Sequence, residues 1–210
     1  MIPSAEAGTQ NGKSGGFTRQ ELAIISASVC ILVLLMAVWR KNAMDLPARR
    51  ICQSNIKQLF MGFNSYAEAN GRLPRAARSN VTNSEDWIFW QSDRYLDQSA
   101  IAKHMSNFLS VLRCPADTGF GYRQYPYSYS MNVNVEKLPF QDMTNQNQVI
   151  LLFEESSPND GTCAVGMPND TLTHRHVYCS NAGFLDGHVE RIAVSTGTSR
   201  EHSEPDYRIH

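Results

Sequence analysis

One uncharged stretch near the N-terminal end separates the chain into two kinds of sequence. Leu22–Trp39 contains eighteen residues without a charge, and as a helix they would span about 27 Å, close to the hydrocarbon thickness of a bilayer. A secretory signal peptide has a shorter apolar core and a small-residue cleavage site, whereas this stretch ends in Trp39-Arg40-Lys41. A helix of a soluble protein would keep a polar face towards water, and these eighteen positions leave none. The pattern therefore predicts a single membrane span.

A second, amphipathic pattern follows the span. Pro47 is expected to kink or interrupt the helix. Beyond it, apolar side chains recur at steps of three and four residues, which places them on one helical face. They are Ile51, Cys52, Ile56, Leu59, Phe60, Phe63 and Tyr66. The Asn70-Gly71 pair predicts the helix end, and the apolar face is interpreted as part of the core of a globular domain.

The remainder of the chain shows strand patterns separated by loops. Strands are predicted at Tyr125–Val135, at Gln148–Glu154 and at His174–Ser180. The second of these is apolar on both faces and should be central in a sheet. Asp186-Gly187 predicts a hairpin turn within Asn181–Val194, and the Pro- and Gly-containing segment Ser156–Asp170 predicts a long loop. The aromatic group Trp87-Ile88-Phe89-Trp90 is interpreted as a core anchor.

Length and net charge restrict the possible partners of the chain but do not indicate a reaction. The chain has 210 residues and a net charge of −1, which gives no reason to expect nucleic acid as a partner. The segment before the span is polar and is interpreted as a removable leader. The expected organisation is a leader (1–16), the transmembrane part of the N-terminal helix (17–41), an amphipathic helix (42–71), a globular α+β domain (72–194) and a flexible tail (195–210).

The residues at the start of the span carry a resemblance to a known class. Gly16-Phe17-Thr18, then two residues, then Glu21-Leu22 before an apolar helix resembles the cleavage and methylation signature of type IV prepilins and type II secretion pseudopilins. The resemblance implies cleavage between Gly16 and Phe17, methylation of the new N-terminal Phe17, and a role for Glu21 in aligning subunits in a filament. Arg19 and Gln20 depart from the pattern, since the family usually has apolar residues there.

A second motif extends the resemblance to nearly the whole chain. His176 is followed after nine residues by Asp186-Gly187, which matches the His-x9-Asp-Gly motif of one prepilin-type family, and Cys114-Pro115 and Ser130-Met131-Asn132 match it as well. The resemblance implies a pilin-like α+β fold, in which a long N-terminal helix packs on an antiparallel sheet of about four strands. It also implies a structural subunit of a type II secretion or related filament assembly.

Partners and location follow from the same resemblance. The expected partners are a prepilin peptidase, other pilin-like subunits, the secretion assembly platform and membrane lipid. The expected location is the inner membrane, with a single span and a periplasmic or otherwise extracytoplasmic C-terminal domain. The basic residues oppose this orientation, because Arg40, Lys41, Arg49 and Arg50 follow the span. The alternative function is a permanently anchored periplasmic binding module whose helix is only a tether. A metal ion is one ligand that such a module could bind.

The cysteines bear on the compartment. Cys30 lies inside the span, which leaves Cys52, Cys114, Cys163 and Cys179 as disulfide candidates. Four cysteines allow three connectivities. The pairs Cys52–Cys114 and Cys163–Cys179 are favoured, and disulfides would indicate an oxidising compartment.

Several roles are open for the motif residues. In the structural interpretation, Asp186 serves its turn and His176 hydrogen-bonds a neighbouring strand or that turn. A calcium site could use Asp160, Asp170 and Asp186, and a zinc site could use His174, His176, Cys163 and Cys179. A catalytic set would combine Glu154 or Glu155 with His176 and Asp186, but no nucleophile elbow or phosphate loop supports an enzyme. The prediction is a protein without catalytic activity and without a cofactor.

Overall fold

The computed structural model describes residues 16–78, 81–119, 125–139, 143–163 and 170–193. The chain divides between Lys41 and Asn42 into two compact units. The predicted leader and tail lie outside the described residues, apart from Gly16. Helix α1 (Arg19–Asn70) contributes residues to both units.

In the first unit, α1 has no partner for its apolar side chains. Every described residue from Gly16 to Lys41 is exposed, and the helix is long and apolar enough to cross a membrane. Its first turn is closed by Thr18 and Glu21. The backbone N–H of Thr18 donates to Glu21 Oε2 over 2.8 Å and the N–H of Glu21 donates to Thr18 Oγ1 over 3.3 Å. This reciprocal pair is a capping box, which satisfies two N–H groups that an open helix end would leave unpaired.

In the second unit, the remaining residues of α1 are buried along one face. The buried positions are Cys52, Asn55, Ile56, Leu59, Gly62, Phe63, Tyr66 and Ala67. This confirms the predicted core face, although Ile51 is 48% exposed and does not belong to it. The helix ends at Asn70, and Gly71 follows with a positive φ of 71°. Pro47 does not interrupt the helix. One missing backbone hydrogen bond is tolerated because packing holds the residues that follow.

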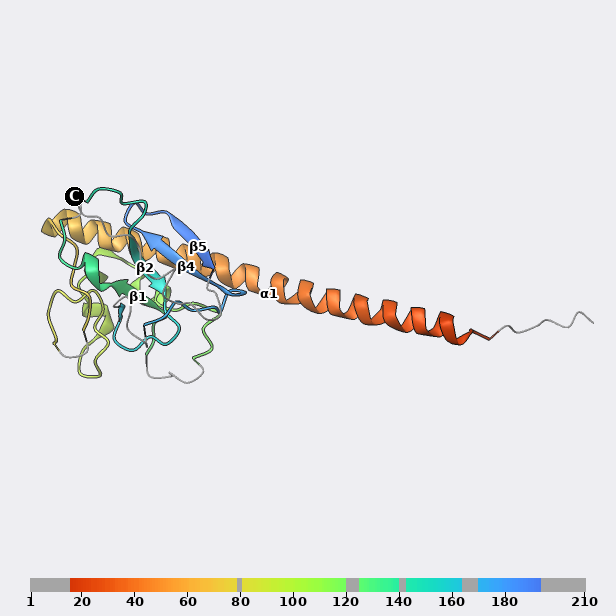
Figure 1. Cartoon of the computed structure of the whole chain (residues 1–210). Coiled ribbons are helices and arrows are strands. Elements are labelled where there is room, and N and C mark those ends of the chain that lie inside the picture. Colours follow the sequence, from red (N-terminus) through yellow and green to blue (C-terminus); the bar gives the residue numbers. More distant parts are fainter. Residues whose placement is uncertain (1–15, 79–80, 120–124, 140–142, 164–169, 194–210) are drawn as a thin grey trace, which may run out of the picture. The chain divides into compact units, whose positions relative to one another are not determined.

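The sheet has five strands in the order β3-β1-β2-β4-β5 (Figure 1). They are β1 (Tyr129–Asn132), β2 (Ile150–Glu154), β3 (Thr162–Cys163), β4 (Cys179–Phe184) and β5 (Val189–Ala193). β2 is central and wholly buried, as its apolar sequence predicts. The four-stranded antiparallel expectation is wrong, because β3 pairs parallel to β1 and makes the sheet mixed. β3 lies in the segment predicted to be a loop.

Short helical turns connect the sheet to the rest of the unit. They are η1 (Leu96–Gln98), η2 (Ala102–His104), α2 (Phe108–Val111) and η3 (Val133–Val135). The predicted strand Tyr125–Val135 is therefore shorter, because η3 replaces its end. Trp87 and Ile88 are fully buried in the core that also contains the buried face of α1, which confirms the interpretation of the aromatic group as an anchor.

Two glycines of the β4–β5 hairpin allow the second-unit part of α1 to lie close to the sheet. Figure 1 shows this part of the helix beside β2 and β4. A Cβ at Gly183 would collide with Ile56 Cγ2, and a Cβ at Gly187 would lie 2.7 Å from Phe60 Cε1. Gly187 also has a positive φ of 86°, as the predicted turn requires. The hairpin prediction is confirmed, and the glycines fix how closely the hairpin packs on the helix.

Candidate functional site

A tight turn before β4 presents His176 to the interior. The N–H of His176 donates to the carbonyl of Cys179 over 3.3 Å and the N–H of Cys179 donates to the carbonyl of His176 over 3.2 Å. Val177 and Tyr178 between them have φ values of 49° and 61°, the backbone of a type I′ turn. Strand β4 begins only at Cys179, so the predicted strand His174–Ser180 is wrong for the residues from His174 to Tyr178. A β-branched residue is costly in this conformation, and the turn leaves His176 fully buried.

His176 joins a helix to the central strand through both nitrogens of its ring. Nδ1 lies 2.8 Å from Asp45 Oδ1 on α1, and Nε2 lies 3.1 Å from Glu154 Oε1 at the end of β2. Burial by itself lowers the pKa of His176, but the hydrogen bonds and charges of Glu154 and Asp45 outweigh it and raise that pKa. The shift is towards the protonated form of the ring, in which both nitrogens donate.

The same carboxylate is held from its other side by β4. Glu154 Oε2 accepts from the backbone N–H of Asn181 over 2.9 Å and from its Nδ2 over 3.0 Å. Glu154, His176 and Asn181 have no solvent exposure. A buried carboxylate requires this degree of hydrogen bonding, and the three contacts tie α1, β2 and β4 to one point.

A disulfide completes this polar cluster. Cys52 on α1 is bonded to Cys114, 62 residues along the chain, and Cys114 Sγ lies 3.3 Å from His176 Nε2. This is the first of the two favoured pairings. The second is wrong, since Cys163 and Cys179 are free thiols. Cys163 is on β3 and Cys179 begins β4, so β1 and β2 lie between them and separate them by about 14 Å, beyond disulfide reach.

The other half of the His-x9-Asp-Gly motif lies elsewhere. Asp186 is in the turn after β4, where its Oδ1 accepts from the backbone N–H of His188 over 3.1 Å and also contacts the His188 ring. The six residues of β4 separate this turn from His176 by about 20 Å. The structural interpretation of both residues agrees with these contacts. The catalytic set does not assemble, because only Glu154 and His176 meet.

Glu155 belongs to a different environment from its neighbour Glu154. Its Oε2 accepts a hydrogen bond from Ser130, and its Oε1 is buried with no hydrogen-bond partner within the described segments. The pKa of Glu155 is raised to about 9, chiefly by burial; the Ser130 hydrogen bond opposes this rise, and the charges of Asp170 and Asp160 add to it. Glu155 is therefore protonated at neutral pH.

The calcium and zinc sets inferred from sequence are not brought together. Asp160 precedes β3 near the end of β2, while Asp186 lies beyond the start of β2, because Phe184 pairs with Ile150. The three calcium candidates thus occupy opposite ends of the sheet. Of the zinc candidates, His176 directs its ring nitrogen at Cys114 Sγ, which is outside that set, and it contacts Cys179 through the backbone. The residues that sequence reasoning missed are Asp45 and Asn181, for which no local pattern gives a signal.

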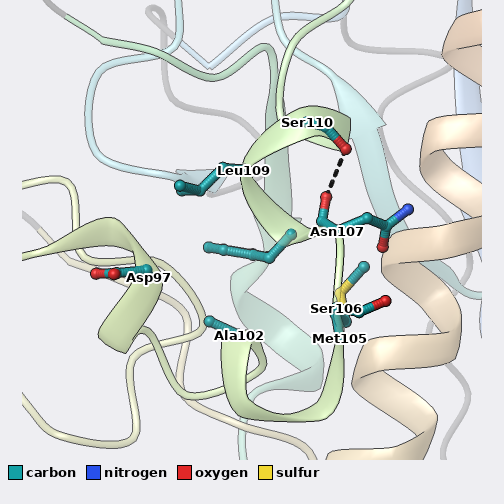
Figure 2. Close-up of a pocket in the computed structure, with 8 residues that line it drawn as sticks. Asp97, Ala102, Met105, Ser106, Asn107, Leu109 and Ser110 are labelled. Atoms are coloured by element: carbon teal, nitrogen blue, oxygen red, sulfur yellow. Dashed lines mark hydrogen bonds between the residues drawn. The ribbon is translucent and has the colours of Figure 1, made fainter.

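A surface hollow lies apart from this cluster, around η2 and α2 (Figure 2). Its lining residues are Asp97, Ala102, Met105, Ser106, Asn107, Phe108, Leu109 and Ser110. Ser110 Oγ donates to the carbonyl of Asn107 over 2.7 Å, as Figure 2 shows. Of the described residues that line the hollow, Asp97 alone has an ionisable side chain.

Comparison of the chain with protein-family models, with curated proteins and with solved structures finds no match. The prepilin resemblance therefore stays a prediction that rests on the residues quoted for it.

His176 should contribute far more stability than Asp186. His176→Ala leaves the buried carboxylate of Glu154 and the half-buried carboxylate of Asp45 without the imidazole between them, and we expect it to lower the free energy of unfolding by about 3–5 kcal/mol. Asp186→Ala removes a partly exposed turn contact and should cost about 1 kcal/mol. Urea unfolding of the full chain in detergent measures both, and equal losses would contradict the assigned role of His176.

Glu155 should make the folded state less stable as the pH rises. Its carboxyl pKa increases from 4.5 to about 9 on folding, so between these values the folded chain holds a proton that the unfolded chain has released. Stability then falls with rising pH, by at most about 1.4 kcal/mol per pH unit. Glu155→Gln should remove this dependence between pH 5 and 8. The control is Glu68→Gln, at an exposed carboxylate of α1, which should follow the wild type. Identical pH profiles for wild type and Glu155→Gln would refute the assignment.

Proposed function

We propose that this chain is a pilin-like structural subunit of a type II secretion or related filament assembly. The observation that supports it best is the dual character of α1. One helix is fully exposed and apolar over its first part and is buried against a sheet over its second part. A subunit of this kind resides in the membrane through the exposed part before assembly and buries the same part against other subunits afterwards. A pure tether requires no such helical continuity.

The disulfide supports the proposed orientation. Cys52 and Cys114 are paired in the second unit, and such bonds persist in oxidising compartments rather than in the cytoplasm. We therefore assign the second unit to the periplasmic or otherwise extracytoplasmic side, although the basic residues after the span favour the opposite side. A prepilin peptidase would then cut between Gly16 and Phe17.

Glu21 distinguishes a filament subunit from a tethered binding module. In the isolated chain its carboxylate caps the helix through Thr18, which is sufficient to explain an acidic residue at this position in a tether. In a filament, the carboxylate would also offset the positive N-terminal amine of a neighbouring subunit in a medium of low dielectric constant. Only the second role needs the negative charge.

The test compares two substitutions of Glu21 in cells that assemble the filament. Glu21→Gln keeps a residue that can form the capping box but removes the charge, whereas Glu21→Ala removes both. We expect both variants to insert in the membrane and both to be lost from the sheared filament fraction. Thr18→Ala is the matched control, since it weakens the cap and keeps the charge, and it should assemble. Normal incorporation of Glu21→Gln would contradict the proposal and favour the tether.

A further inference from the structure

Four potential metal ligands converge on one buried point. The sulfurs of Cys52 and Cys114, a carboxylate oxygen of Glu154 and a ring nitrogen of His176 all lie within 4.8 Å of one another, and all four residues are buried. Four ligands arranged tetrahedrally around zinc are separated by about 3.3–3.8 Å. From this convergence we propose that the dithiol form of the chain binds one zinc ion through these four side chains.

The contacts around the ligands match those of a prepared metal site. His176 Nε2 is directed at both Cys114 Sγ and Glu154 Oε1, at 3.3 and 3.1 Å, so an ion replaces that nitrogen's proton between the same groups. Nδ1 is held by the carboxylate of Asp45 at 2.8 Å. A ligating histidine typically has such a carboxylate on its second nitrogen, where it fixes the tautomer and ring orientation.

The fourth ligand is oriented in the same way. Asn181 holds Glu154 Oε2 through two hydrogen bonds, which leaves Oε1 for the contact with His176 Nε2. Two thiolates and a carboxylate would place three negative charges in a buried space, and such charges require a cation. Thiolate and imidazole ligands select zinc over calcium or magnesium.

The disulfide and the metal exclude one another. A thiol or phosphine reductant supplies two electrons, and with two protons they convert the S–S bond into two thiols. Zinc then displaces those two protons and the proton on Nε2 as the metal–ligand bonds form. A disulfide oxidant reverses the step by exchange: its own S–S bond breaks, it accepts two electrons from the two thiolates and it leaves as two thiols. The Cys52–Cys114 bond then reforms, both sulfur ligands are lost and zinc leaves. The site is open in chains whose cysteines have not yet been oxidised, and this inference does not depend on the proposed function.

The experiment uses the full chain in detergent, stripped of metal and purified throughout with a phosphine reductant, alongside oxidised chain without reductant. Zinc is titrated against a chromophoric chelator. We expect one zinc per reduced chain and none per oxidised chain, and cobalt in place of zinc should give thiolate-to-cobalt charge-transfer absorption. Zinc should also raise the melting temperature of the reduced chain. A reduced wild type without zinc binding, or without that shift, would overturn the proposal.

Matched variants locate the site. Cys163→Ser/Cys179→Ser removes the free thiols of the second unit and should bind as the wild type does, whereas Cys52→Ser/Cys114→Ser should lose saturable binding. Asp45→Asn changes a positioning residue and should weaken zinc affinity by about 10- to 100-fold with unchanged stoichiometry. Unchanged binding in Cys52→Ser/Cys114→Ser would show that other ligands hold the metal and would refute the assignment.

Discussion

The second unit depends on how the amphipathic part of α1 is fastened to the sheet. Apolar burial supplies most of the driving force, since Ile56, Leu59 and Phe63 are fully buried in the shared core. The polar cluster then selects one arrangement. Asp45 and Cys52 on the helix are held by His176 and Cys114, and His176 in turn holds Glu154 of the central strand. Because a half-satisfied buried network is costly, sliding of the helix along the sheet would leave charges unpaired.

The part of α1 in the first unit differs in character from the part that packs on the sheet. An exposed apolar helix leaves its side chains in contact with water, which is unfavourable, so the residues of the first unit suit an apolar surrounding such as the interior of a bilayer. At the start of the helix, the capping box of Thr18 and Glu21 pairs two backbone N–H groups. One helix thus meets two different surroundings, and the residues of each part suit only one of them.

Much of this architecture could be predicted from sequence where the pattern is strong and local. The apolar run that became β2, the hairpin at Gly187 and the core face of α1 each have a clear periodic or turn signal. β3 has two residues and no period. The turn at Val177 and Tyr178 adopts a backbone that neither residue favours, so propensity predicted a strand. The site needed Asp45, 131 residues from His176, and such a distant contact arises only from the packing of helix on sheet.

We propose that α1 belongs to a processed filament subunit rather than to a permanent tether. Mass spectrometry of the intact protein from its native membrane tests it most directly, because processing changes the first residue and its chemistry. We expect a mature chain that begins at an N-methylated Phe17. A membrane-resident chain that still carries the residues before Phe17 would contradict it.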